Sequence, residues 1–484
     1  MMLPRRTALK LVSMGAVTVF AGQVTFAQQS LRTRRSLTGM DLDDPDLSAY
    51  RDFVRLMKAK DQATPVSWLG FANQHGSVAG GYKFCPHGDW YFLPWHRAYV
   101  LMYEAAVQAL TGKSDFAMPY WNWTEMRLLP DAFANPRYKG LPNPLFVRNR
   151  NKLSGTNALT DSIVGQTQVI DRIYDETVFE AFGTTRNPSQ TNLDPSWVVR
   201  RGGFQGILES TPHNLVHNNI GAYMPTAASP RDPIFFMHHS NIDRIWDHWN
   251  SLGRTNSTDP LWLNMPFTNN YLKPDGTPYT TIVKDLQNIS ALGYRYDFRS
   301  QLDNRLSDPG RESRLLAVLQ SKPGTNIVGT QRFGGLNKTA ATASNPLAQS
   351  MSLTASSLTA LTAPSDGKVE EVYALIGDIA LGDNVRGIRV FVNHPELSIE
   401  TPDTDPHYVK TIAFLDHSGH GDENANKQLP SVLVNLTATL KRLRGFDRLK
   451  AGEISVQLIP IPVDGVIIDN VGQVVPGSLE IVVL

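Results

Sequence analysis

The chain has 484 residues and a formal net charge of +1, with 46 Lys and Arg against 45 Asp and Glu, so no charge excess favours nucleic acid or an acidic membrane surface as a partner. Hydrophobic residues make up 41% of the sequence, which permits a globular core in two or three domains. The single cysteine, Cys85, excludes an internal disulfide framework.

Residues 1–30 are predicted to be a targeting segment rather than part of the fold. Arg5-Arg6 fits a twin-arginine export signal, and an apolar run broken by Gly15 and Gly22 follows it. The run is too short and too rich in glycine for a membrane span. We expect a signal peptide, export of the folded chain to the periplasm or beyond, and no stable membrane insertion after cleavage; an uncleaved N-terminal anchor is the alternative.

Two helices are predicted in the first hundred residues. Asp44 can cap a helix in which Pro45 takes the first position, and an apolar stripe follows. Ser67 to His75 fit a second, short helix that ends at Gly76. The first folded domain is therefore expected to begin near Asp44.

A third helix is predicted over residues 94–110, with Gly112 as its stop. His96 lies on the inward stripe of this helix. Together with His75 at the end of the preceding helix and His87 in the loop between them, it forms a first trio of histidines.

A second trio is predicted from helical geometry. His213 and His217 lie four residues apart, so they project from one helix face and can chelate one ion. Farther along, His239 falls on an inward stripe, His238 is rotated about 100° away from it, and His248 points to the opposite side. We expect His239 to be the third ligand, His238 to lie beside the site and His248 at the surface. The stripe consists of Phe235, His239, Ile242, Trp246 and Trp249.

Two trios of this kind predict a pair of metal ions. A lone inward histidine is more often a core residue, but two trios with most members at helix-compatible inward positions reduce the weight of that interpretation. Imidazole ligands without carboxylates favour copper, zinc or iron, and imidazole-only coordination of each of two ions by three residues points to copper. Ligand softness alone does not separate copper from zinc.

Four segments resemble the signature of type-3 copper proteins, which comprise tyrosinases, catechol oxidases and molluscan haemocyanins. They are residues 87–97, 118–123, 212–217 and 232–244. The resemblance covers roughly residues 44–300, and the whole chain is most similar to the proteobacterial tyrosinases of the Ralstonia and Burkholderia kind. It implies a mainly α catalytic domain with a four-helix bundle around a binuclear copper site. In that family the first copper is held by residues matching His75, His87 and His96, and the second by those matching His213, His217 and His239.

The resemblance also implies a covalent bond at the first copper. Cys85 stands two residues before His87, the offset at which fungal tyrosinases join a cysteine to the histidine ring by a thioether. Such a bond would fix the imidazole of a ligand that no helix orients. A small buried thiol is the alternative.

The implied reaction is the O2-dependent ortho-hydroxylation of monophenols to catechols and the oxidation of o-diphenols to o-quinones. Two copper ions would be the cofactors, O2 the co-substrate, and tyrosine, DOPA and catechols the phenolic substrates. A catechol oxidase without monophenolase activity and a haemocyanin-like oxygen carrier are the alternatives.

Three further residues have roles implied by the resemblance. Glu209 and Asn214 match a glutamate and an asparagine that hold a water, which takes the proton of the phenol. Thr226 is a small residue where plant relatives carry a bulky gate, although Met224 could refill that space. The alternatives are a first-turn helix carboxylate for Glu209 and a solvent-facing helix residue for Asn214.

The last third of the chain changes in composition. Between about residues 331 and 366, Ala, Ser, Thr and Leu dominate without periodicity, which predicts a linker. Beyond it, recurrent strands and turn signals predict a small antiparallel sandwich or barrel. The predicted strands are residues 369–375, 387–392, 408–415, 431–439, 454–460 and 478–483.

This last part resembles the C-terminal shielding domain of plant and some bacterial tyrosinases, which covers the copper mouth. His417 and His420 could collect copper there, or belong to a polar surface loop. The predicted organisation is a twin-arginine signal peptide (1–30), a tyrosinase copper-binding domain (40–335), a linker (336–366) and an all-β shielding domain (367–484).

Overall fold

The computed structural model describes residues 31–151, 153, 157–199, 203–297, 308–336, 339–352, 371–415, 428–445, 453–463 and 466–484. The expected signal peptide and the pair His417 and His420 lie outside these residues. In the described residues no helix has the length and apolar character needed to cross a bilayer.

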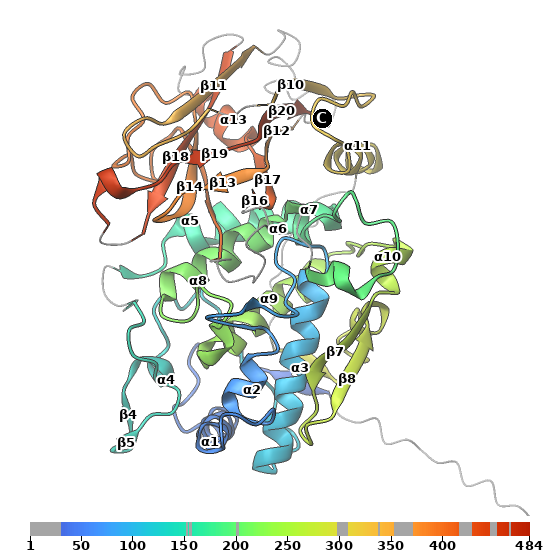
Figure 1. Ribbon diagram of the computed structural model, residues 1–484, viewed down its shortest axis with the longest axis vertical. Helices are drawn as coiled ribbons and strands as arrows, with labels where there is room; N and C mark the ends of the chain where they lie inside the picture. Colours follow the sequence, from blue (N-terminus) through green and yellow to red (C-terminus); the bar gives the residue numbers. More distant parts are fainter. Residues whose placement is uncertain are drawn as a thin grey trace, which may run out of the picture.

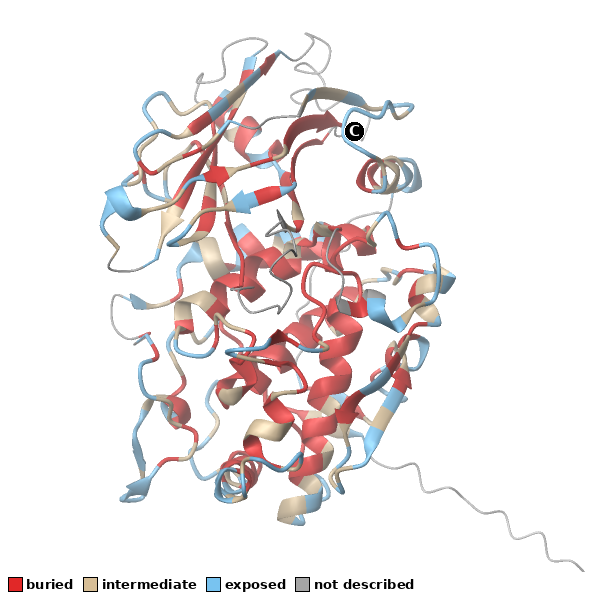
Figure 2. Cartoon of the chain, in the orientation of Figure 1, coloured by how far each residue is buried: buried red, intermediate tan, exposed pale blue. Residues whose placement is uncertain are grey.

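Two long helices form the centre of the first domain (Figure 1). α3 (Phe92–Thr111) and α9 (Ile234–Ser251) pack against each other and are buried along most of their length (Figure 2). α3 ends at Gly112, which adopts a left-handed φ of 73°, a conformation that glycine adopts without steric cost. The predicted stop is confirmed, while the helix begins two residues before Pro94.

Shorter helices surround this pair. Asp44 caps α1 (Pro45–Ala59) by accepting from the backbone N–H of Asp46, and Ser67 caps α2 (Trp68–Ala72) by accepting from Gly70. α8 (Asn214–Ile220) follows a π-helical turn, Glu209–His213. The four-helix bundle is not confirmed, because α2 has five residues and α8 seven, too few to pack along several turns.

The remaining elements of the first domain form its periphery. They are β2 (Gly76–Ser77), β3 (Gly81–Tyr82), α4 (Asp131–Ala134), β4 (Arg137–Tyr138), β5 (Leu141–Pro142), α5 (Asp161–Val164), α6 (Asp171–Asp175), α7 (Phe179–Gly183), α10 (Pro260–Leu263), β7 (Pro266–Leu272) and β8 (Pro278–Ile282).

The first domain begins earlier than the sequence predicts. β1 (Arg32–Arg34) pairs in parallel with β9 (Tyr294–Tyr296), so the expected start near residue 40 is too late. A basic stretch is usually solvated, but the Arg34 side chain is fully buried and bonds to Glu104 and Asp243.

The C-terminal part is a β-sandwich, as predicted. Its strands pair antiparallel, except that β6 of the first domain adds to β17 in parallel. One sheet has the order β10 (Gln331–Leu336), β20 (Ser478–Val483), β12 (Val372–Gly377), β17 (Ser431–Asn435) and β6 (Phe204–Gln205). The other has the order β11 (Leu347–Ser352), β18 (Glu453–Pro462), β14 (Val385–Val392) and β15 (Tyr408–Ala413). A small third sheet contains β16 (Gln428–Leu429), β13 (Ile379–Leu381) and β19 (Val474–Val475).

Two details of the predicted second domain are wrong. The linker assigned to residues 336–366 contains β11, which pairs with β18. β11 buries Leu347 and Met351, but the residue between them on the same face is Gln349, so the sequence of this edge strand lacks the apolar alternation that predicts strands. The strand predicted over residues 431–439 ends at Asn435, and helix α13 (Thr437–Gly445) follows.

The two domains are joined by more than the chain. In Figure 1 the sandwich lies on the end of the first domain where α5, α6 and α7 are found. Arg311, on the connecting helix α11 (Pro309–Leu319), bonds to Glu176 of the first domain and Glu371 of the second. β15 contacts both α8 and the turn before it.

Candidate metal centre

The structure gathers two groups of buried side chains that could hold metal ions. Within each group the ligand atoms lie within 4.8 Å of one another. Both predicted trios are brought together in this way. The groups are His75, Cys85, His87 and His96, and His213, His217, His238 and His239.

The two groups adjoin and form one centre. The rings of His96 and His239 stack with centroids 4.2 Å apart and an interplanar angle of 14°, and the rings of His87 and His213 lie 5.6 Å apart. α3 supplies His96 and α9 supplies His239. The packing of these two helices therefore sets the separation of the two half-sites.

Backbone carbonyls fix the proton position on three of the histidines. Nδ1 of His75, His96 and His217 lies 2.7, 2.8 and 2.6 Å from the carbonyl oxygens of Ala227, Phe92 and Met224, respectively. A carbonyl only accepts, so Nδ1 carries the proton and Nε2 keeps the lone pair that a metal requires. Nε2 of His75 is buried without a hydrogen-bond partner, as expected for a ligand atom.

Hydrogen bonding also separates the two adjacent histidines of α9. The indole of Trp123 donates to Nδ1 of His238 at 3.1 Å, so the neutral ring of His238 carries its proton on Nε2 and offers no lone pair there. Nε2 of His239 lies 3.3 Å from Nε2 of both His213 and His217. His239 thus completes the second trio, and His238 lies beside it.

Burial keeps five of the six predicted ligand rings neutral. Desolvation lowers the pKa of His75 to about 3 and that of His217 to about 4, and it lowers the pKa values of His96, His213 and His239 well below 6.5. Neutral imidazoles without a carboxylate in either group fit copper, with zinc as the chemical alternative.

Cys85 lies against two histidines of the first group. Its Sγ is 3.4 Å from Nδ1 and 3.7 Å from Nε2 of His87, and 3.3 Å from Nε2 of His96. The sulfur is nearly equidistant from the two nitrogens of His87, as it must be to face the Cε1 atom between them. The geometry is compatible with the proposed thioether.

Glu209 is buried and engaged on both carboxylate oxygens. It accepts from the backbone N–H of Gly88 and from the hydroxyl of Thr184, each at 2.7 Å. Its partner Gly88 follows His87, so Glu209 links the two half-sites. Sequence reasoning missed its neighbour Asp89, whose pKa is raised well above its usual value by burial and by the charge of Glu209.

Asn214 is also buried rather than solvent-facing, with 1% of its surface exposed. Its Oδ1 lies 2.8 Å from Nδ1 of His213, and its Nδ2 donates to the carbonyl of Ala413 in the C-terminal domain at 2.8 Å. The Ala413 contact fixes which end of the amide faces His213, so Nδ1 of His213 donates.

Thr226 is half-buried in the loop that orients one histidine from each trio. Its hydroxyl donates to the carbonyl of Tyr223 at 2.9 Å and accepts from the backbone of Ala228 at 3.2 Å. In the same loop, Met224 and Ala227 provide the carbonyls that hold His217 and His75.

His248 does not lie at the surface, so that prediction is wrong. It is 1% exposed and packs edge-on against Tyr174 of α6, with ring centroids 4.6 Å apart. The outer face of α9 is therefore covered, which the spacing of apolar residues within α9 cannot reveal.

A buried ionic cluster ties the two central helices together. Arg97, next to His96, bonds to Asp243, one turn after His239, at 2.5 Å, and Arg34 bonds to both Glu104 of α3 and Asp243 of α9. Sequence reasoning missed these residues, although a charged residue on a buried helix face was a usable signal.

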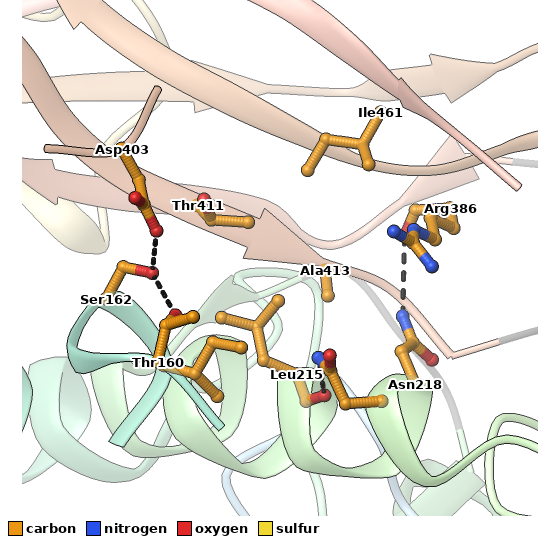
Figure 3. Close-up of a pocket in the computed structure, with 11 residues that line it drawn as sticks. Thr160, Ser162, Leu215, Asn218, Arg386, Asp403, Thr411, Ala413 and Ile461 are labelled. Atoms are coloured by element: carbon orange, nitrogen blue, oxygen red, sulfur yellow. Dashed lines mark hydrogen bonds between the residues drawn. The ribbon is translucent and has the colours of Figure 1, made fainter. Parts of the chain in front are cut away.

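The C-terminal domain packs against segments of the first domain that carry the centre. A Cβ atom at Gly88 would lie 2.2 Å from Cγ of Pro430, and Leu415 packs in the hydrophobic core of the first domain. A cavity of about 220 Å³ lies between the domains, lined among others by Leu215, Asn218 and Ala413 (Figure 3). None of the six predicted ligands lines it.

Comparison with known proteins identifies the central part of the chain. Residues 65–252 match the common central domain of tyrosinase. A tyrosinase of Hahella sp. is 28% identical over 312 residues, which are 55% of this chain and 63% of that protein. A chloroplastic polyphenol oxidase of Ipomoea batatas is 29% identical over 296 residues, 53% of this chain and 48% of that protein. The chain thus matches only about half to two thirds of the length of these relatives.

Solved structures match over nearly the whole chain. Latent apple tyrosinase superimposes with a TM-score of 0.64 at 21% identity, covering 93% of this chain and 97% of that one. A latent aurone synthase, a polyphenol oxidase, gives a TM-score of 0.63 at 19% identity and covers 94% and 90%. At these identities the likeness concerns the fold, including the C-terminal sandwich.

Proposed function

The chain belongs to the tyrosinase family of type-3 copper proteins, and from that premise we propose that it is a copper-dependent oxidase of phenols. It hydroxylates monophenols at the ortho position and oxidises o-diphenols to o-quinones. The observation that carries the proposal is the pair of adjoining histidine trios. In them, backbone carbonyls take the Nδ1 proton of His75, His96 and His217, so that Nε2 of each ring carries the lone pair that a metal requires.

The residues present fit two copper ions. His75, His87 and His96 would hold one, and His213, His217 and His239 the other. When bound, the two ions supply electrons for the reduction of O2 and acidify a phenol hydroxyl that contacts them.

The chain itself must accept the proton of the phenol, whose ordinary pKa is about 10. We propose that Glu209 and Asn214 hold the water that does so. In the covered form, Glu209 is bonded to Gly88 and Thr184, and Asn214 to His213 and Ala413. This arrangement supports a resting state in which the proton path is not yet assembled.

The covered form is proposed to be latent. Leu415 packs into the core of the first domain and Pro430 lies against Gly88, so phenols reach the centre only after the C-terminal domain moves. Thr226 then offers a small side chain near the entrance. The matching structures of apple tyrosinase and aurone synthase are likewise structures of the latent forms of those proteins.

Two further features belong to the proposal. The Cys85–His87 thioether would fix the imidazole of His87, which stands on the loop before α3 rather than on a helix. Export by the twin-arginine route would deliver the folded protein, with its metal, to the periplasm or beyond.

Substrate range separates the proposal from its neighbours. Copper-loaded full-length protein, with and without a sub-denaturing detergent, is offered tyrosine and DOPA while O2 uptake and quinone formation are recorded. Oxidation of both supports a tyrosinase. Oxidation of DOPA alone identifies a catechol oxidase, the alternative favoured by the polyphenol oxidase relatives. Reversible O2 binding without oxidation of either identifies an oxygen carrier, which the closed centre favours.

A further inference from the structure

Strand β15 of the C-terminal domain lies along α8, and side chains of the first domain donate hydrogen bonds to the backbone carbonyls of this strand and of the residue after it. Three side chains, one in the turn before α8 and two on α8 itself, each donate to a backbone carbonyl at residues 411–414. The pairs are Thr211 with Thr411 at 2.8 Å, Asn214 with Ala413 at 2.8 Å, and Asn218 with Phe414 at 3.3 Å. Figure 3 shows Asn218 on the helix facing the strand that carries Thr411 and Ala413.

The middle contact continues to a predicted metal ligand. Oδ1 of Asn214 accepts from Nδ1 of His213, while the other end of the same amide donates to Ala413. A chain of hydrogen bonds therefore runs from the ring of His213 through Asn214 to the backbone of the C-terminal domain.

His213 differs in this respect from the other histidines with a defined partner. His75, His96 and His217 are oriented by carbonyls of the first domain itself. The partner of His213 is a side-chain amide, and an amide can rotate so that its NH2 group faces the ring instead. Among the residues that the structure describes, the Ala413 contact is the one that holds the accepting oxygen towards His213.

We propose that Asn214 is a positioning residue through which docking of the C-terminal domain and metal binding at the second half-site reinforce each other. A cation on Nε2 of His213 makes its Nδ1–H a stronger donor, which polarises the amide and strengthens its bond to Ala413. Thermodynamic linkage is reciprocal. Docking of the strand therefore raises the metal affinity of the half-site by the same factor by which bound metal raises the equilibrium constant for docking.

The C-terminal domain is then part of the support of the metal centre as well as its cover. Its displacement releases Asn214 and weakens the hold on one ion of the pair. The inference rests on metal binding by the proposed oxidase, but not on its turnover of phenols.

Full-length protein tests the coupling with Cu(I) as the probe. Hydrogen exchange of the amides in residues 408–415 is compared between metal-free and copper-loaded protein. Copper affinity is measured by competition with a chromophoric Cu(I) chelator. Both are repeated for Asn214→Asp, which keeps an acceptor for His213 but cannot donate to Ala413, and for Asn214→Ala, which loses both contacts.

Thr211→Val is the matched control. Thr211 donates to the same strand but has no hydrogen bond to a histidine among the described residues, so its loss weakens docking without touching the ligand.

Copper is expected to slow exchange at residues 408–415 in the wild type. Both Asn214 variants should lose this difference. Asn214→Ala, which removes the hydrogen-bond partner of His213, should also hold one of two copper ions about 10-fold more weakly or worse. Thr211→Val should exchange faster in both states yet keep the copper-dependent difference.

Equal exchange with and without copper in the wild type would overturn the inference, as would a copper-dependent difference that survives in Asn214→Asp. If Asn214→Ala does not fold, the wild type and Asn214→Asp decide the matter. A protein that shows the coupling but oxidises no phenol would refute the proposed function and leave this inference standing.

Discussion

At the scale of single residues, the choice between His238 and His239 has two independent supports. Helical periodicity places His239 on the inward stripe, and the structure shows that Trp123 donates to Nδ1 of His238. The sequence could predict the first fact because it depends on spacing within one helix. It could not predict the second, because Trp123 comes from a distant loop.

Copper content checks this assignment. His239→Ala is expected to lower the copper bound by full-length protein from two ions per chain to one, because it removes a lone-pair donor from the second trio. His238→Ala, its neighbour and matched control, should retain two. Metal analysis after gel filtration gives the count, and loss of an ion only in His238→Ala would reverse the assignment.

The buried histidines also predict the pH dependence of stability in the metal-free protein. Burial lowers the pKa of His75 to about 3 and of His217 to about 4, against 6.5 in an unfolded chain. Between these values the unfolded chain binds more protons, so the free energy of unfolding falls as the pH drops below 6.5. Each such histidine contributes a slope of about 1.4 kcal/mol per pH unit.

Urea unfolding of metal-free protein at pH 7, 6 and 5 measures this slope. Carboxylates with ordinary pKa values titrate below this window, whereas Asp89, whose pKa is raised by burial and by the charge of Glu209, takes up its proton first in the folded chain and offsets part of the slope. A free energy of unfolding that stays constant over the window would contradict neutral, buried imidazoles.

At the scale of elements, periodic and capped segments were predictable and edge elements were not. α1, α3 and α9 carry their caps, stops and stripes within the sequence. β1 and β11 do not, because an edge strand is defined by its partner. The burial of the α9 face that carries His248 could not be predicted for the same reason, because it depends on packing against α6.

The ionic cluster between α3 and α9 is the element-scale feature that holds the two half-sites in place. Asp243→Asn leaves Arg34 and Arg97 buried beside a neutral amide, and breaking a buried pair in this way typically costs about 3–5 kcal/mol. Asp52→Asn is the control, because Asp52 pairs with Arg55 at the surface, where such pairs contribute about 0–1 kcal/mol.

Urea unfolding of both variants in metal-free form measures the difference. Equal free energies of unfolding for Asp243→Asn and Asp52→Asn would show that the cluster does not hold the helices together.

At the scale of the whole molecule, the sequence predicted two domains but not how they meet. The strands of the sandwich follow from alternating residues, whereas the contacts of β15 with α8 involve backbone carbonyls, which carry no sequence signal. The contacts of Leu415 and Pro430 with the first domain likewise could not be predicted from the sequence.

Leu415 provides a test of closure. Leu415→Ala removes an apolar side chain from the core of the first domain, and truncations of this kind typically cost about 2–5 kcal/mol. We expect weaker docking and a higher rate of DOPA oxidation without detergent, measured against the detergent-treated rate of the same protein. An unchanged ratio of the two rates would mean that Leu415 does not keep the centre closed.

We propose that one centre of six histidines, covered by the C-terminal domain, holds two copper ions and oxidises phenols. The most direct measurement is the copper content of full-length protein together with O2 uptake on tyrosine after release of the C-terminal domain by mild detergent. We expect two copper ions per chain and O2 uptake accompanied by quinone formation, and we expect both to be lost in a His96→Ala, His239→Ala double variant. A single bound ion, or turnover that persists in that variant, would contradict it.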